Sequence, residues 1–219
     1  MEHVCVVDIE TIPAQGPESL ESAKAAVKPP ANIKKPESIQ KWMDENAENA
    51  AKEALAKTSF DPARGHICTI SWAIDDDAPV VAHAETVEQE ADVIRAFFSA
   101  FRSFAKYTLV GHYIGGFDIR FILCRAVVLG IEIPRQIPRD PKPWDKSMFD
   151  TMTAWAGARG SIRMDNLASA LGLEGKGDFD GSMVAEAWAN GEHQKIADYC
   201  VSDVIATRDI YRKFQAVGW

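Results

Sequence analysis

The amino-acid sequence predicts an α/β fold in which helices flank a mixed central sheet, with a helical insertion after the first strand. Strand-like segments come first along the chain, and a helix-like segment, another strand and several helices follow, an order typical of α/β domains. The chain has 219 residues, enough for one large hydrophobic core, and its 47% hydrophobic content is ordinary for a globular protein. We therefore expect a single domain over residues 1–219, with residues 15–61 inserted within it.

The first strand and the insertion differ in composition. Val4–Ile9 is a largely apolar, β-branched run, typical of a strand buried on both faces. Gln15–Pro36 is rich in Pro, Ala and Lys and is expected to be a loop or arm. Ile39–Lys57 is rich in Ala and Glu and contains no Gly or Pro, which predicts a helix.

Two further strands, a helix and another strand are predicted next. His66–Ile74 and Val80–Ala84 are strand-like and are separated by a turn-like run of acidic residues. The apolar spacing within Val87–Phe104 predicts a helix that packs on a sheet, and Tyr107–Gly111 is expected to be a short strand.

The remainder is predicted to be mainly helical. Phe117–Leu129 is a strongly apolar helix ended by Gly130, and Arg135–Lys146 is a Pro-rich loop. Further helices are expected at Phe149–Trp155, Asp165–Leu171, Met183–Asn190 and Gln194–Phe214.

The net charge limits the classes of nucleic-acid protein that fit. A formal charge of −8 argues against a protein whose whole surface attracts nucleic acid, because such domains are usually basic. It leaves room for a nucleic-acid enzyme, since carboxylates that hold divalent cations count as negative in this sum.

The cysteines and the N-terminus predict a soluble cytoplasmic protein. Cys5, Cys68, Cys124 and Cys200 are far apart and lie in apolar segments, which favours buried free thiols over disulfides or zinc. We expect no signal peptide, and no stretch approaches the length of a membrane span.

Asp8 and Glu10 are the first candidate functional residues. Residues two apart on a strand share a face, so both carboxylates project together from the end of an apolar strand. Two such acids repel, and oxygen ligands of this kind suit Mg²⁺ or Mn²⁺. A solvated strand end is the alternative, since this short pattern is common.

Asp118 follows a glycine-bearing loop and lies in the first turn of an apolar helix. The helix dipole and the free N–H groups favour an acid there, so simple helix capping is an alternative to a functional role.

Tyr199 and Asp203 are four residues apart on the last helix and share one face. The neighbouring apolar residues indicate that this face is packed, although a surface Tyr–Asp pair is the alternative.

Together, the three segments resemble the motifs of the DEDD superfamily of 3′→5′ exonucleases, which has a ribonuclease-H-like fold. They read Val-Val-Asp-Ile-Glu-Thr, Val-Gly-His-Tyr-Ile-Gly-Gly-Phe-Asp-Ile-Arg-Phe-Ile and Tyr-Cys-Val-Ser-Asp-Val, and they span nearly the whole chain. Tyr199, four residues before Asp203, is typical of the tyrosine (DEDDy) type. Within that type the chain resembles free-standing predicted exonucleases related to the proofreading domain of family B DNA polymerases, often encoded by phages or prophages. The segment that runs from Lys34–Ile39 through Leu55–Pro62 resembles the insertion seen after the first motif in that group.

The resemblance implies hydrolysis from the 3′ end of DNA, preferably single-stranded, with two divalent cations, Mg²⁺ or Mn²⁺. Asp8, Glu10 and Asp203 would hold one cation, with Asp8 bridging to a second held by Asp118. Two cations roughly 4 Å apart stabilise both the attacking and the leaving oxygen. Tyr199 would orient the attacking water, because a phenol with a pKa near 10 is a poor base at neutral pH.

One position departs from the family pattern. Tyr113 stands where these enzymes usually have Asn, which predicts altered loop or substrate contacts with the metal site intact. Asp150 matches a recurrent acidic position before a helix, and we interpret it as an N-cap.

Substrate contacts are expected from a second set of residues. Base stacking by Phe117, Trp155 or Trp188 is a weaker hypothesis than core packing for each ring. The candidate substrate-binding residues are Thr11, His112, Phe117, Arg159 and Arg163, with a loop-supporting role as the alternative for His112 and a solvated surface for the two arginines.

The insertion has a charge pattern of its own. Lys28, Lys34, Lys35 and Lys41 give it local positive charge within an acidic protein, which suggests an arm that guides a nucleic-acid strand. Replication or recombination proteins are further candidate partners.

Three other functions stay open at this point. No motif recognises the 2′-hydroxyl, so an exoribonuclease that trims RNA 3′ ends fits nearly as well. A non-catalytic nucleic-acid-binding accessory protein fits less well, because all four acids and Tyr199 are present. A metal-dependent phosphatase acting on small nucleotides is the third.

Overall fold

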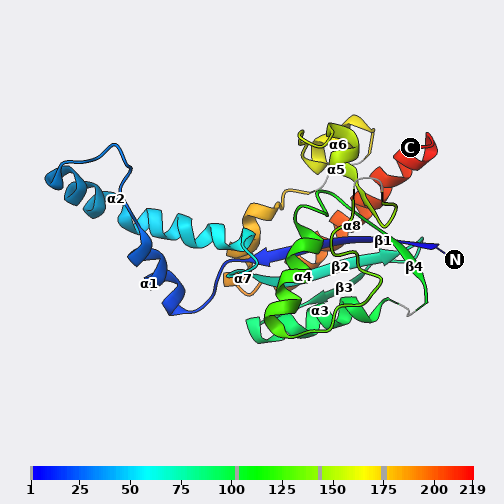
Figure 1. Ribbon diagram of the computed structural model, residues 1–219, viewed down its shortest axis with the longest axis horizontal. Helices are drawn as coiled ribbons and strands as arrows, with labels where there is room; N and C mark the ends of the chain where they lie inside the picture. Colours follow the sequence, from blue (N-terminus) through cyan, green and yellow to red (C-terminus); the bar gives the residue numbers. More distant parts are fainter. Residues whose placement is uncertain (1, 102–103, 143–144, 174–176) are drawn as a thin grey trace.

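The computed structural model describes residues 2–101, 104–142, 145–173 and 177–219 (Figure 1). Its centre is a five-stranded sheet in the order β3-β2-β1-β4-β5. Strand β2 pairs antiparallel with β1 and β3, whereas β4 pairs parallel with β1 and β5, which confirms the predicted mixed sheet. The strands are β1 (Glu2–Ile12), β2 (His66–Ile74), β3 (Val80–His83), β4 (Lys106–Gly111) and β5 (Met148–Asp150).

Helices cover both faces of the sheet (Figure 1). Among the described residues, none of them is both long enough and apolar enough to cross a membrane. The α-helices are α1 (Pro17–Ala26), α2 (Pro36–Ala56), α3 (Glu90–Ser99), α4 (Asp118–Leu129), α5 (Thr151–Ala156), α6 (Met164–Ala170), α7 (Val184–Ala189) and α8 (His193–Ala216), and the 3₁₀ turns are η1 (Lys57–Phe60), η2 (Val87–Gln89) and η3 (Gly181–Met183).

Strand β1 lies in the middle of the sheet, and its side chains alternate between two layers of helices. Val7 and Ile9 pack into the larger core, which α3 and α4 complete. Val6 packs on the opposite face with Val204 of α8. The predicted buried strand is therefore confirmed, and its even-numbered residues face α8.

Three expectations for local structure need correction. The segment expected to be a loop at 15–36 contains α1, because a proline is tolerated at the first position of a helix and an Ala- and Glu-bearing run follows it. The helix expected at Phe149–Trp155 begins instead with the edge strand β5. The helix expected over Val87–Phe104 begins with the 3₁₀ turn η2, and its α-helical part, α3, ends at Ser99. Residues 102–103 of this prediction lie outside the described residues.

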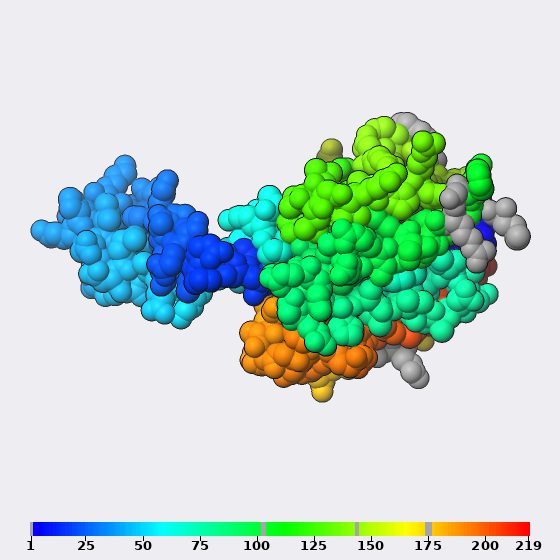
Figure 2. All heavy atoms as spheres, turned by 90° about the horizontal axis from the view of Figure 1, so that it is seen from below, coloured from blue at the N-terminus to red at the C-terminus, as the bar shows by residue number. Residues whose placement is uncertain are grey.

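Helices α1 and α2 form an arm that projects from the body of the molecule (Figures 1 and 2). They are described throughout, and Ala51 is their one buried side chain. The arm is therefore held mainly by contact between its own two helices and by its junction with the sheet, and not by burial in the core.

The positive charge of the arm lies in the loop that joins its helices. Residues 27–35 carry Lys28, Lys34 and Lys35, all exposed, and no acidic residue. On the helices, by contrast, lysines pair with acids, as Lys24 does with Glu21. The expected local charge is thus concentrated at the end of the arm far from the sheet (Figure 1).

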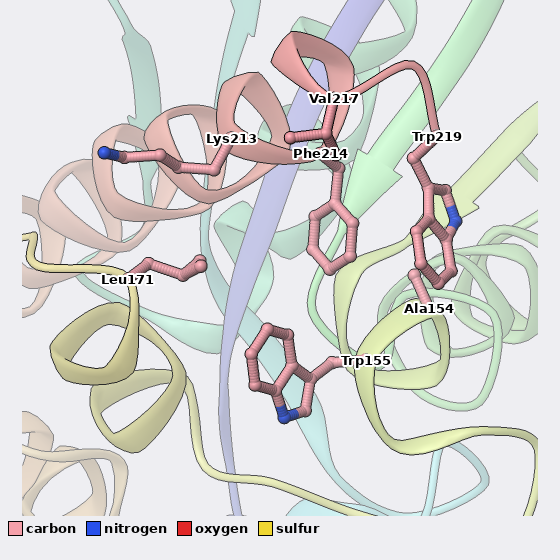
Figure 3. A pocket seen from close by; sticks show the side chains of 7 residues that line it. All are labelled: Ala154, Trp155, Leu171, Lys213, Phe214, Val217 and Trp219. Carbon is pink, nitrogen blue, oxygen red and sulfur yellow. The ribbon is translucent and has the colours of Figure 1, made fainter.

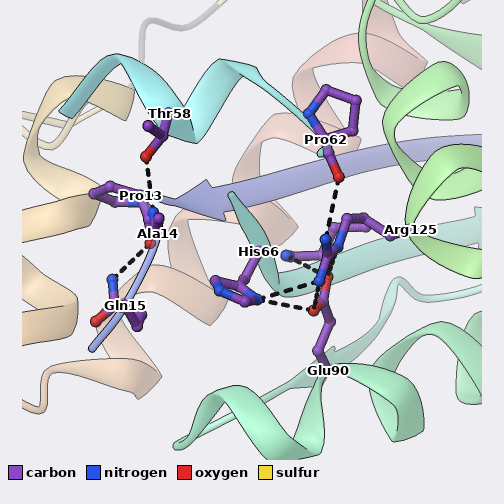
Figure 4. Close-up of polar contacts among 9 residues, drawn as sticks. Pro13, Ala14, Gln15, Thr58, Pro62, His66, Glu90 and Arg125 are labelled. Atoms are coloured by element: carbon purple, nitrogen blue, oxygen red, sulfur yellow. Dashed lines mark hydrogen bonds and ion pairs between the residues drawn. The ribbon is translucent and has the colours of Figure 1, made fainter. Parts of the chain in front are cut away.

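A buried ion pair joins α3, α4 and β2 (Figure 4). Arg125 donates from Nε and Nη2 to the carboxylate of Glu90 at 2.8 and 2.7 Å, and from Nη1 to the carbonyl of Pro62 at 3.1 Å. The Ile67 N–H donates to Glu90 at 2.9 Å, and His66 Nδ1 lies 3.1 Å from it. Burial alone would raise the pKa of Glu90, but these hydrogen bonds outweigh burial and lower that pKa.

Removing the arginine from this pair should destabilise the fold strongly. We expect Arg125→Met to lower the free energy of unfolding by about 3–5 kcal/mol, because it leaves the buried Glu90 carboxylate without its counter-charge. Urea unfolding followed by circular dichroism measures the loss. The matched control is Arg95→Met, which removes the exposed Arg95–Asp92 pair and should cost less than about 1 kcal/mol. Similar losses in both variants would contradict the structural role of the buried pair.

Candidate functional site

Strand β1 carries two acids past the end of its pairing with β4. That pairing stops at Val6 opposite Val110, so Asp8 and Glu10 lie beyond the last β4 partner. Both face α8, and carboxylate oxygens of the two lie within 4.8 Å of one another and of the Cys200 sulfur. Glu10 is buried and Asp8 is half-buried. The predicted pairing of these two carboxylates on one face is confirmed.

Asp118 meets β1 from the other layer of helices. It is the first residue of α4 and is only 5% exposed. Its carboxylate accepts hydrogen bonds from its own N–H and from the N–H of Ile9, between the two strand acids. Burial first, and then the charges of Asp150 and Asp203, outweigh the effect of these N–H groups and raise the pKa of Asp118 to about 7.

Helix α8 supplies Tyr199 and Asp203. Asp203 is 4% exposed and is hydrogen-bonded to the Tyr199 hydroxyl. Burial first, and then the charges of Asp203, Glu10 and Asp8, raise the pKa of Tyr199 far above its usual value. The protonated hydroxyl is therefore favoured over the phenolate in this acidic setting, and Tyr199 can donate a hydrogen bond. The ring of Phe179 packs against the Tyr199 ring at 5.0 Å.

Cys200 is a site residue that sequence reasoning assigned only to the core. Its sulfur lies 3.4 Å from both the carbonyl oxygen and the Oδ2 of Asp8. Burial, followed by the charges of Asp8, Glu10 and Asp203, raises the pKa of Cys200 well above its usual value. The thiol therefore favours its protonated form here and donates a hydrogen bond to Asp8, and its sulfur also lies within 4.8 Å of the carboxylate oxygens of Asp8 and Glu10. Its place three residues before Asp203, on the same helical face, is the signal that sequence analysis could have used.

The four acids and Tyr199 thus come together from three elements, β1, α4 and α8. Each element belongs to the core of the domain, so the positions of the carboxylates are set by packing. Such a concentration of negative charge in a low-dielectric setting is costly without a cation, and an all-oxygen donor set fits Mg²⁺ or Mn²⁺.

The loop after β4 is held by a network of hydrogen bonds. His112 uses both ring nitrogens, toward the Thr151 hydroxyl at 2.9 Å and the Ile162 carbonyl at 2.8 Å, so it supports the loop. Asp150 caps α5, as expected, and its Oδ1 also accepts from the Tyr113 N–H at 3.1 Å. Tyr113 has a left-handed backbone (φ 69), a conformation that Asn adopts more easily than Tyr, which agrees with the expectation of Asn at this position.

The other candidate contact residues lie at different distances from the acids. Thr11 follows Glu10 and donates its hydroxyl to the carbonyl of Ser59 at 2.8 Å. Phe117 precedes Asp118, and its half-buried ring packs on Phe121. Arg159 and Arg163 are exposed on the segment between α5 and α6, and the structure gives neither a contact with the acids.

A separate apolar pocket contains Trp155 (Figure 3). It has a volume of about 420 Å³, and its lining includes Trp155, Phe214, Val217 and Trp219. Trp155 is 48% exposed, so the expected core packing is wrong for this ring, whereas Trp188 is half-buried against the core. No carboxylate lines this pocket among the described residues, which distinguishes it from the acidic site.

Three comparisons relate the chain to known proteins. The sequence model of a family described as "Predicted 3'-5' exonuclease related to the exonuclease domain of PolB" matches residues 62–218. A DNA polymerase of Pyrococcus glycovorans is 25% identical over 187 residues, which cover 74% of this chain and 24% of the polymerase. The family B DNA polymerase of the hyperthermophilic archaeon Pyrobaculum calidifontis has a similar structure, with a TM-score of 0.62 at 17% identity over 97% of this chain and 24% of the polymerase. The chain thus spans about a quarter of the length of these relatives, and the structural likeness confirms the predicted fold.

Divalent cations should stabilise the folded protein through the acidic site. Mn²⁺ at about 100 times its Kd is expected to raise the free energy of unfolding by about 2.7 kcal/mol, because it binds the assembled carboxylates and not the unfolded chain. Urea unfolding with and without the metal measures the rise. The double variant Asp8→Asn, Asp203→Asn should lose it, and Asp140→Asn, which removes an exposed carboxylate paired with Lys142, should keep it. Equal stability of the unaltered protein with and without Mn²⁺ or Mg²⁺ would argue against a metal site.

Proposed function

The chain belongs to the family of predicted 3′-5′ exonucleases related to the exonuclease domain of PolB, and from this membership we propose that it is a metal-dependent 3′→5′ exonuclease acting on DNA. The observation that carries the proposal is the convergence of four carboxylates and one tyrosine from β1, α4 and α8. A protein with a purely structural role has no reason to bury acids against one another, since each buried charge destabilises the fold.

Each carboxylate has a proposed ligand role. Asp8, Glu10 and Asp203 would hold one Mg²⁺ or Mn²⁺, and Asp118 would hold a second, with Asp8 shared between them. When bound, the cations supply stabilisation of the negative charge that develops on the attacking and leaving oxygens of a phosphodiester. The backbone N–H groups of Ile9 and Asp118 support this role, because they orient the Asp118 carboxylate toward the strand acids.

Tyr199 and Cys200 are proposed to position other groups. The Tyr199 hydroxyl, protonated and hydrogen-bonded to Asp203, would orient the attacking water by a further hydrogen bond. Cys200 would fix the rotamer of the Asp8 carboxylate through its S–H donor. Neither side chain needs to take a proton from the water in this arrangement.

DNA is the proposed substrate, with single strands preferred. Both relatives are named as DNA polymerases, which favours DNA over RNA, although the chain covers only a quarter of each. An exoribonuclease acting on RNA 3′ ends uses the same site and is the second candidate. A non-catalytic accessory protein is disfavoured, because the carboxylates needed for chemistry are all present and assembled.

The whole of residues 1–219 is proposed to act as one exonuclease domain, with residues 15–61 as an insertion that guides the strand. The exposed Lys28, Lys34 and Lys35 at the far end of the arm are suited to contact phosphates. Because the rest of the chain is acidic, these lysines would hold the strand on the arm while its 3′ end extends to the acidic site in the body.

Hydrolysis of a 5′-labelled single-stranded DNA oligonucleotide tests the main proposal. With Mg²⁺ or Mn²⁺ we expect a ladder of progressively shorter labelled products, which establishes 3′→5′ polarity. EDTA and Asp203→Ala should each abolish the ladder. A matched RNA oligonucleotide run beside the DNA distinguishes the two substrates, and intact DNA with degraded RNA would overturn the DNA assignment.

Tyr199 should contribute less than the metal carboxylates. We expect Tyr199→Phe to lower kcat by about 10–100-fold, the loss typical when a residue that hydrogen-bonds to a metal ligand, without binding the metal itself, is replaced. Asp203→Ala should reduce hydrolysis to background. Single-turnover rates on the same oligonucleotide measure both. A Tyr199→Phe variant as inactive as Asp203→Ala would indicate that the hydroxyl does more than orient the water.

The arm lysines should determine part of the salt dependence of DNA binding. Replacing Lys28, Lys34 and Lys35 by Gln should lower the slope of log Kd against log salt by up to about 2, since each phosphate contact on a single strand contributes about 0.7. Fluorescence anisotropy in EDTA measures the slope without hydrolysis.

The matched control replaces three arm lysines that already pair with acids, Lys24, Lys41 and Lys52. This triple variant should change the slope much less. An unchanged slope in the first variant, or in a deletion of residues 20–57, would refute the guiding role of the arm.

A further inference from the structure

Phe60 is a large aromatic residue that the fold leaves 71% exposed. It is the last residue of η1, where the arm meets the body. Scattered exposed apolar side chains are normal on protein surfaces, so exposure by itself indicates nothing. The position of this ring and the way its backbone is held distinguish it from such cases.

The backbone before Phe60 is bound to the segment that follows the strand acids. The Thr11 hydroxyl donates to the carbonyl of Ser59 at 2.8 Å. Thr58 is buried, and its hydroxyl accepts from the Ala14 N–H at 2.8 Å (Figure 4). Two bonds therefore hold η1 on the end of β1.

The backbone after Phe60 is held by the body as well. The carbonyl of Pro62 accepts from Arg125, whose guanidinium is itself fixed by Glu90 (Figure 4). Gly65 lies so close to the carbonyl of Thr58 that a Cβ would clash with it. The chain on both sides of Phe60 is thus anchored, and the ring is exposed from a fixed backbone.

The Phe60 ring contacts a residue that adjoins one acid in the sequence, and the residue before Phe60 is bonded to a residue that adjoins another. Its centroid is 6.2 Å from that of Phe117, with 56° between the ring planes. Phe117 immediately precedes Asp118, and Thr11, bonded to the neighbour of Phe60, immediately follows Glu10. Phe60 and Phe117 therefore form an aromatic pair, one ring from the arm and one from the body, and the chain links this pair to Asp118 directly and to Glu10 through Thr11.

We propose that Phe60 and Phe117 form a stacking platform for the unpaired bases of the DNA strand whose 3′ end enters the acidic site. This inference depends on the proposed function. Aromatic rings bind the flat face of any base without recognising its sequence, which suits an enzyme that removes nucleotides in succession. Stacking requires bases that are not paired, so the platform selects single-stranded ends. Phe60 supplies the exposed half of the platform, and the insertion contributes it.

Substitution of Phe60 tests the platform through substrate binding. Phe60→Ala should raise KM for a single-stranded oligonucleotide by about 5- to 140-fold, the equivalent of about 1–3 kcal/mol of stacking per base, with a smaller change in kcat. Phe60→Trp should restore binding. The matched control is Phe104→Ala, since Phe104 is fully exposed and lies near Glu2, at the opposite end of β1 from the acids.

Abasic substrates separate stacking from a structural effect. On an oligonucleotide whose 3′-terminal nucleotides lack bases, the unaltered protein and Phe60→Ala should have the same KM. A loss that persists on the abasic oligonucleotide, or a KM unchanged by Phe60→Ala on the ordinary one, would overturn the platform.

A binding measurement distinguishes failure of the platform from failure of the proposed activity. In EDTA, a 2-aminopurine at the 3′ end should be quenched by the unaltered protein and by Phe60→Trp, but not by Phe60→Ala. Quenching retained in Phe60→Ala refutes the platform. Loss of quenching in Phe60→Ala supports the platform whether or not the protein hydrolyses DNA. Absence of hydrolysis with Mg²⁺ or Mn²⁺ would overturn the exonuclease proposal alone.

Discussion

Repulsion among buried carboxylates is the constraint on which the other features of the molecule depend. Asp118 and Asp203 are almost fully buried, and Glu10 lies beside them. Taking an ionised carboxylate out of water costs several kcal/mol, so a chain selected for stability alone would place apolar groups here. The N–H groups that bond to Asp118 and the hydroxyl that bonds to Asp203 compensate in part. The favourable free energy of the large apolar core that packs against β1 offsets the rest of this unfavourable term.

The sheet meets this constraint through the unequal lengths of its strands. Strand β1 runs past the end of β4, so its last acids are not covered by a parallel neighbour. The N-terminus of α4 fills that space with the carboxylate of Asp118, and α8 covers the other side with Tyr199, Cys200 and Asp203. The helix layers that bury Val7 and Val6 on opposite faces of β1 are thus the same layers that bring the candidate site residues together.

Features that depend on local periodicity could be predicted from the sequence, and features that depend on distant partners could not. The shared face of Asp8 and Glu10 follows from the period of a strand, and the place of Asp118 follows from the way helices begin. Strand β5 has three residues, too few for a periodic signal, and it exists only because β4 pairs with it. The role of Cys200 and the position of Phe60 arise from contacts across the fold, with Asp8 and Phe117 respectively. Helix α1 lies in a segment whose Pro, Ala and Lys content predicted a loop or arm, because a proline in the first turn of a helix cannot be told from one in a loop by composition.

The near absence of buried side chains in the arm has a consequence for how this protein can diversify. Ala51 aside, substitutions in α1 and α2 disturb no core contact, so the arm tolerates mutations that the body would not. Its length, charge and tip composition can drift under selection while the carboxylates, embedded in packed helices, stay fixed. The fold therefore keeps the arm, where few side chains are buried, apart from the packed elements that carry the candidate site, with Phe60 at the boundary between them.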